Sequence, residues 1–163
     1  MLDDADLEGV AGWLFTRSRL HPADPCDPFE LARALGVTII ETRERVCAAL
    51  VANDPPLVML RVRRDERATA FALAHELAHL GMRRCGIREQ TECDADEIAR
   101  RMLVPSGFVR VECLVRGRTI AQLPALAPLV DPRVVIARAR HVLGLHVPVR
   151  EASAAARSNS SAA

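Results

Sequence analysis

The spacing of apolar positions changes along the chain and divides it into helices and strands. Helical spacing predicts a first helix over residues 7–15. Asp27-Pro28-Phe29-Glu30 has the form of a capping box and opens a second helix that ends at Gly36. Three runs of branched apolar residues then predict a small meander of strands, at residues 37–40, 46–51 and 57–62. Because the strands come early and helical spacing returns later, the pattern indicates an α+β fold.

Helical spacing returns at Glu66, where a long helix is predicted to run to about Met82. One face of it collects Phe71, Ala74, His75, Ala78, His79 and Met82. Another helix begins at Thr91, and Pro105 interrupts it. Its buried face is expected to carry Glu92, Ala95, Asp96, Ile98, Ala99, Met102 and Leu103.

Two shorter helices are predicted over residues 119–130 and 132–143. Asp131 is the expected N-cap of the second, with Pro132 in its first turn and Gly144 at its C-terminal end. Residues 151–163 are rich in alanine and serine, and we expect them to be disordered.

Composition narrows the class of protein. Half of the 163 residues are apolar and 26% are charged, with a net charge of +1, which indicates a folded domain and excludes a strongly basic nucleic-acid binder. All 22 basic residues are arginine and tyrosine is absent. No apolar run approaches the roughly 20 residues of a membrane helix, and the acidic start differs from a signal peptide, so we expect a cytoplasmic protein without membrane contact. The five cysteines include no C-x-x-C pair and are expected to be reduced thiols.

The sharpest motif is His75-Glu76-Leu77-Ala78-His79. Two imidazoles four residues apart on one helical face can hold a zinc ion, and the glutamate between them can act as general base on the water bound to the metal. The alternative is a pair of hydrogen-bonded core histidines in an ordinary amphipathic helix. The motif contains no glycine or proline and lies on the apolar side of its helix, which favours the metal site.

The downstream residues bear on the third ligand. The pattern H-E-x-x-H-x-x-G-x-x-H fails, because Met82 replaces its glycine and Cys85 its last histidine. A second pattern, Glu-x-x-x-Asp, is present: Glu92 would bind the metal, and Asp96 would accept the ring N–H of a bound histidine. We expect both carboxylates on an otherwise apolar face, where unpaired charge is costly, and Asp94 in solvent. Asp94 and Cys85 remain alternative ligands, and favourable placement at the helix N-terminus is the alternative explanation of the two acids.

Both motifs resemble those of the ImmA/IrrE metallopeptidases, small bacterial zincins of the thermolysin-like kind. Residues 67–80, RATAFALAHELAHL, are similar to the family's R-x-x-F-T-L-A-H-E-L-G-H-L, and residues 92–105 to E-x-x-A-N-x-F-A-x-x-L-L-M-P. Residues 29–37 look like the family's early helix, so the resemblance covers roughly residues 25–110. The chain departs from the pattern at Ala78, Asp96 and Val104, where glycine, asparagine and methionine are usual.

The resemblance implies a zincin-like minidomain over residues 1–110, with the sheet packed on the two motif helices, and a small helical extension over residues 111–150. It implies a zinc-dependent endopeptidase with His75, His79 and Glu92 as ligands and Glu76 as base. Its substrate would be a helix-turn-helix transcriptional repressor, cleaved to relieve repression after DNA damage or phage infection.

Two other functions stay open. One is a catalytically silent, zinc-stabilised binding module, for instance an antitoxin-like partner; an intact Glu76 speaks against it. The other is a nucleic-acid-binding protein with structural zinc; a site with only three protein ligands speaks against that.

Three further hypotheses concern other residues. A stripe of arginines could bind single-stranded DNA as an activator, although a solvated face is favoured because aromatic residues are scarce there: Arg110, Arg116, Arg118, Arg133, Arg138 and Arg140. His141 or His146 could stabilise an oxyanion, or be ordinary surface or core histidines. Cys113 could cap the zinc and hold the enzyme inactive, whereas the alternative is that all the cysteines are inert apolar residues.

Overall fold

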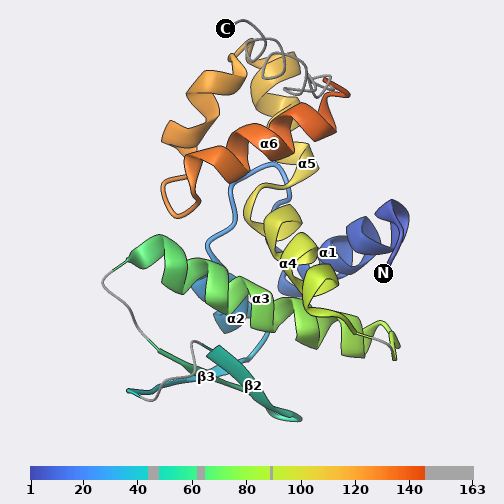
Figure 1. The fold of residues 1–163 in the computed structure, drawn as a ribbon, viewed down its shortest axis with the longest axis vertical. Helices are drawn as coiled ribbons and strands as arrows, with labels where there is room; N and C mark the ends of the chain where they lie inside the picture. Colours follow the sequence, from blue (N-terminus) through green and yellow to red (C-terminus); the bar gives the residue numbers. More distant parts are fainter. Residues whose placement is uncertain (44–47, 62–64, 89, 146–163) are drawn as a thin grey trace, which may run out of the picture.

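The structure, a computed structural model, describes residues 1–43, 48–61, 65–88 and 90–145 and confirms the α+β class (Figure 1). The first part of the chain contains α1 (Asp4–Ser18), α2 (Pro28–Ala34), β1 (Thr38–Glu41), β2 (Ala48–Asn53) and β3 (Pro56–Leu60). The rest contains α3 (Glu66–Arg84), α4 (Glu92–Leu103), α5 (Ser106–Arg110), the π-helical turn η1 (Val111–Val115), the 3-10 helix η2 (Ile120–Leu126) and α6 (Pro132–Val142). His146 and the predicted disordered tail lie outside the described residues.

Polar side chains begin the long helices at the positions where the sequence changes its spacing. Asp3 caps α1 by accepting the Asp6 N–H at 2.8 Å, so this helix begins three residues before the predicted start. Asp65 caps α3 by accepting the N–H groups of Arg67 and Ala68, and α3 continues two residues past the predicted end. These caps satisfy amide donors that the helices themselves leave without partners.

The sheet is not the predicted meander. Its strand order is β1-β3-β2, with β3 parallel to β1 and antiparallel to β2. β3 takes the centre because Val58 and Leu60 are fully buried, whereas most of β1 is exposed and β2 is only half-buried or exposed. As a result, β2 is an edge strand.

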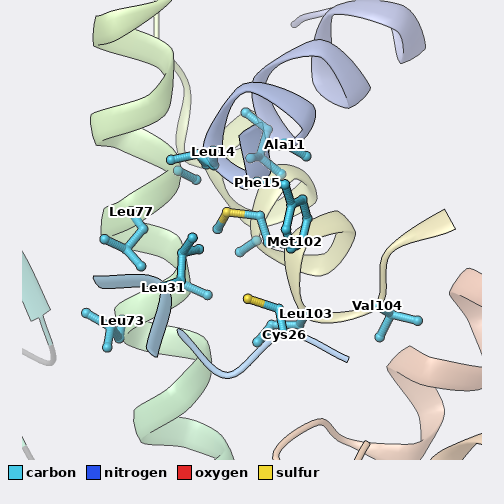
Figure 2. Packing of buried hydrophobic residues seen from close by; sticks show 14 of the residues in the cluster. Ala11, Leu14, Phe15, Cys26, Leu31, Leu73, Leu77, Met102, Leu103 and Val104 are labelled. Atoms are coloured by element: carbon cyan, nitrogen blue, oxygen red, sulfur yellow. The ribbon is translucent and has the colours of Figure 1, made fainter. Parts of the chain in front are cut away.

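Helix α3 lies between the sheet on one side and helices α1 and α4 on the other (Figure 1). Figure 2 shows Leu73 and Leu77 of α3 beside Leu31 of α2, with Phe15 and Met102 completing this part of the core. The approach of α1 to α3 requires a glycine: a Cβ at Gly81 would come within 2.9 Å of Val10 Cγ1. This packing fixes the motif helix from both sides.

The C-terminal elements share the same core, to which Leu123, Val135 and Ala139 contribute. The helix predicted over residues 119–130 is wrong: a 3-10 helix with Pro124 inside ends at Leu126. By contrast, α6 has the predicted N-cap, since Asp131 accepts the Arg133 N–H at 2.7 Å.

A network of ion pairs around two buried arginines also attaches α6 and α4 to α1. Glu8 of α1 pairs with Arg101, at 3.1 Å, and with Arg138 of α6; the two guanidinium side chains are only 3% and 4% exposed. Asp4 lies 2.6 Å from Arg101, and the hydrogen bond and charge of this arginine lower the pKa of the Asp4 carboxyl.

None of the helices in the described segments is long and apolar enough to cross a membrane.

Candidate metal centre

Helices α3 and α4 bring the two sequence motifs together. His75 and His79 lie one turn apart on α3, and their Nε2 atoms are 3.2 Å apart. Glu92, the first residue of α4, places Oε2 3.0 Å from His75 Nε2 and Oε1 3.6 Å from His79 Nε2. One ligand atom from each of these three residues lies within 4.8 Å of the others, so the group can hold a metal ion.

The spacing of the two nitrogen atoms suits a tetrahedral metal ion. Bonds of about 2.0 to 2.1 Å at tetrahedral angles place ligand atoms about 3.3 Å apart. The two Nε2 atoms are 3.2 Å apart, and Glu92 Oε2 lies 3.0 Å from the Nε2 atom of His75. The 3.6 Å separation from His79 belongs to the other carboxylate oxygen of Glu92, Oε1. Two imidazoles and one carboxylate are a donor set that zinc accepts, with a fourth position left for water or substrate.

The outer nitrogen of each imidazole has its own acceptor. His75 Nδ1 lies 2.8 Å from Asp96 Oδ1, and His79 Nδ1 lies 3.2 Å from Gln90 Oε1. The Gln90 amide is oriented by a hydrogen bond from its Nε2 to the Ile87 carbonyl at 3.1 Å. With a proton on each Nδ1, the two Nε2 lone pairs face each other and a carboxylate, and a cation between them offsets their repulsion.

Gln90 is the site residue that sequence reasoning missed. It lies outside both motifs, in the segment between α3 and α4, and nothing in its sequence surroundings distinguishes it. Asp96, in contrast, lies where the predicted contact with a bound histidine requires it.

The burial expected for the acidic residues of α4 is wrong. The side chains of Glu92 and Asp96 are 82% and 39% exposed, while Asp94 is 1% exposed. Ala95, Ile98 and Met102 form the side of α4 that packs into the core. Glu92 and Asp96 lie on a different side of the helix, next to solvent. The cost of removing the charges of Glu92 and Asp96 from water is therefore small, and no metal is needed to offset it.

Asp94 fastens the start of α4 to the N-terminal segment. It accepts the Leu2 N–H at 2.9 Å and the Thr91 hydroxyl at 2.6 Å. Burial raises the pKa of this carboxyl, but the hydrogen bonds from Thr91 and Leu2 outweigh burial and leave it below its usual value. Asp94 is thus a structural residue here, neither solvated nor part of the metal-binding group.

Glu76 faces the edge of the sheet. Its Oε2 accepts the backbone N–H of Leu50, in β2, at 2.7 Å. A cavity of about 410 Å³ adjoins it and is lined by Ala48, Ala68, Phe71, Ala72, His75, Glu76 and Glu92. The predicted base, two predicted ligands and the edge strand therefore border one cavity.

The structure does not bring Cys113 to the metal-binding group. Its thiol packs partly buried against the core in η1, and burial, helped by the charge of Glu112, raises its pKa. Cys85 does not belong to the group either; it is exposed, although the burial it has raises its thiol pKa. Among the described residues Cys113 does not join His75, His79 and Glu92, and a zinc cap by this thiol stays a prediction.

The predicted arginine stripe is also interrupted. Arg138 is buried in its ion pair with Glu8, and Arg116 and Arg118 both pair with the buried Glu112. Three of the six side chains are exposed with no ion pair among the described residues: Arg110, Arg133 and Arg140.

His141 does not line the cavity beside the imidazoles. Its Nε2 lies 3.4 Å from Asp4 Oδ1, at the junction of α6 with α1. His141 is therefore not among the described residues that could stabilise an oxyanion in this cavity.

Comparisons with family models, curated proteins and solved structures found no match to this chain. The functional argument therefore depends on the geometry of the site and on the motifs themselves.

Proposed function

We propose that this chain is a zinc-dependent endopeptidase with a zincin-like fold, with His75, His79 and Glu92 as the zinc ligands. The observation that carries the proposal is the convergence of two imidazole Nε2 atoms and one carboxylate beside the further carboxylate of Glu76. When bound, zinc would polarise a peptide carbonyl and acidify a water molecule enough for it to attack that carbonyl.

Glu76 has the placement of a general base. The Leu50 N–H holds Oε2, and no described residue forms a hydrogen bond with Oε1. The carboxylate is thereby oriented beside the ligand atoms while one oxygen stays available. It can take a proton from the attacking water and pass that proton to the leaving amine.

The edge strand favours a peptide as substrate. An extended peptide can pair with the edge strand of a sheet, and among the described strands β2 is such an edge strand, with its Leu50 N–H already bonded to Glu76. Apolar side chains from β2 and α3 line the cavity at that point: Ala48, Ala68, Phe71 and Ala72. They suit an apolar substrate side chain next to the bond to be cleaved.

The resemblance to the ImmA/IrrE metallopeptidases extends the proposal to its biology. On this basis the substrate is a helix-turn-helix repressor in the cytoplasm, and cleavage relieves repression after DNA damage or phage infection. Activation by single-stranded DNA stays a prediction, to be tested by adding single strands to the cleavage reaction at two salt concentrations.

The proposal is tested with the zinc-loaded protein, a mixture of fluorogenic peptides and a helix-turn-helix repressor from the same genome. We expect cleavage by the unmodified protein and a loss of about 100-fold to 10,000-fold in rate in Glu76→Gln, which should keep its zinc. Glu66→Gln, the same substitution in the first turn of the same helix, is the matched control and should cleave normally.

Cleavage at equal rates by Glu76→Gln and the unmodified protein would contradict the role of the base. A protein that carries one zinc and cleaves neither peptides nor repressor would instead be the zinc-stabilised binding module.

A further inference from the structure

A second concave surface involves α1, α2 and the end of α3, and shares no residue with the cavity beside the metal ligands. It consists of two adjoining hollows, of about 320 and 860 Å³, that share Trp13, Arg17 and Leu35. The first is completed by Pro56, Leu80 and Arg84, and the second by Thr16, Ser18, Arg19, Ala34 and Gly36. We call these two hollows together the Trp13 groove.

The lining of the Trp13 groove combines one aromatic ring with several cations. Trp13 is half-buried, and Arg17 lies one turn further along the same helix. Arg84 borders the first hollow and Arg19 the second, while no aspartate or glutamate among the described residues lines either one. Leu35, which is half-buried, adds apolar surface. A ligand for this surface would carry negative charge and a flat apolar part.

The charge of Arg17 is not explained by contacts among the residues that the structure describes. Arg17 is exposed and has no ion pair or side-chain hydrogen bond with any residue that the structure describes. Its position in the last turn of α1 is favourable, as is that of Arg84 in α3, because cations stabilise the C-terminal ends of helices. That effect accounts for one cation at each helix end. It does not explain why the described residues that line the hollows beside Trp13, the only tryptophan of the sequence, include no acid.

Arg19 adds a cation at a backbone position that glycine would occupy more easily. It forms the C-cap of α1 with φ of 61°, in the left-handed region, and is the only described residue other than glycine with a positive φ.

We propose that the Trp13 groove binds a nucleoside phosphate, with the base stacked on the Trp13 indole and the phosphate paired with Arg17 and Arg19. Guanidinium groups bind phosphate through paired N–H donors, and one aromatic face provides a stacking surface for one base. The size of the hollows fits a ligand of this class. An acidic peptide would match the arginines but makes no use of the indole face. The site is separate from the proposed peptidase chemistry and implies no reaction of the nucleotide.

The sequence provides its own probe, because Trp13 is the single tryptophan and there is no tyrosine. Titration of the full chain with ADP should therefore quench tryptophan emission in a saturable manner. N-acetyltryptophanamide, measured in parallel, corrects for absorption by the nucleotide and for collisional quenching. Inorganic phosphate alone and adenosine alone should each bind at least about 10-fold more weakly than ADP, as measured by competition.

Substitutions separate binding from folding. Arg17→Gln should weaken ADP binding by about 10-fold or more while the far-ultraviolet circular dichroism stays unchanged. Arg110→Gln, which removes an exposed arginine outside the groove, is the matched control and should bind ADP normally. Equilibrium dialysis needs no fluorescence and should show Trp13→Phe binding ADP more tightly than Trp13→Leu.

Three results would each overturn the proposal: no saturable quenching at millimolar ADP, equal affinity of Arg17→Gln and the unmodified protein, or an affinity for phosphate or an acidic peptide that equals the affinity for ADP. Glu76→Gln should bind ADP as the unmodified protein does, so the outcome is independent of the peptidase proposal.

Discussion

Replacing Asp96 by alanine should weaken zinc binding without unfolding the protein. Asp96 Oδ1 lies 2.8 Å from His75 Nδ1 and fixes both the tautomer and the direction of the ring. Loss of such an outer partner typically costs about 10-fold to 100-fold in metal affinity. Because the Asp96 side chain is 39% exposed and also lies 3.6 Å from Arg100, we expect the lower end of this range, about 10-fold to 30-fold. Asp96→Asn keeps an acceptor but loses the charge, and its affinity should fall between the two.

The assay is competition for zinc with a chromophoric chelator at constant pH, together with the urea midpoint of each variant. Glu97→Ala is the matched control, because Glu97 is the next residue on α4 and pairs with Arg100 and Arg101, without a contact to either imidazole. It should change stability only. Equal zinc affinity in Asp96→Ala and the unmodified protein would refute the reasoning, and so would an equal loss in Glu97→Ala.

Three other predictions concern the rest of the fold. Glu8→Gln should lower the free energy of unfolding by about 2 kcal/mol in urea titrations, because two buried arginines lose the carboxylate that they share. Glu30→Gln, the same substitution at an exposed residue, should lower it by less than about 0.5 kcal/mol. The Asp4 pKa lies below its usual value of 3.8, so its contribution to stability is present above that pH and lost as the pH falls further; Asp4→Asn should flatten the decline of the thermal midpoint below about pH 4. Iodoacetamide should modify the exposed Cys93 faster than Cys26, whose pKa burial raises to about 12, and mass spectrometry of peptides gives the order.

Local patterns in the sequence predicted most of the helices. Each long helix begins next to an aspartate or threonine that caps it, and the change from runs of branched apolar residues to helical spacing after residue 65 marks the start of α3. The strand order was not predictable in this way, because pairing of β1 with β3 depends on which strand the helices bury. The segment predicted as a helix over residues 119–130 contains Pro124 and forms a 3-10 helix. The spacing of apolar residues does not distinguish a 3-10 helix from an α-helix there.

The convergence of His75, His79 and Glu92 was predictable because these residues lie in two short motifs on helices. The contacts that position those residues were less predictable. Asp94 was expected in solvent, yet its partner Leu2 lies 92 positions away in the sequence, and Gln90 belongs to no motif. The sequence around Arg138 predicts an exposed arginine, but its side chain is buried and pairs with Glu8. Contacts between segments that are distant in the sequence determine whether such side chains are buried, and the pattern of a single segment does not predict those contacts.

X-ray absorption at the zinc edge of the loaded protein tests the central claim most directly, because it reports the atoms bound to the metal. We predict one zinc per chain, with two imidazoles and oxygen ligands at about 2.0 to 2.1 Å and no sulfur. Glu92→Ala should lose most of the zinc under the same loading conditions, and His79→Ala likewise. A sulfur neighbour at about 2.3 Å, or an unchanged zinc content in Glu92→Ala, would contradict the ligand set His75, His79 and Glu92.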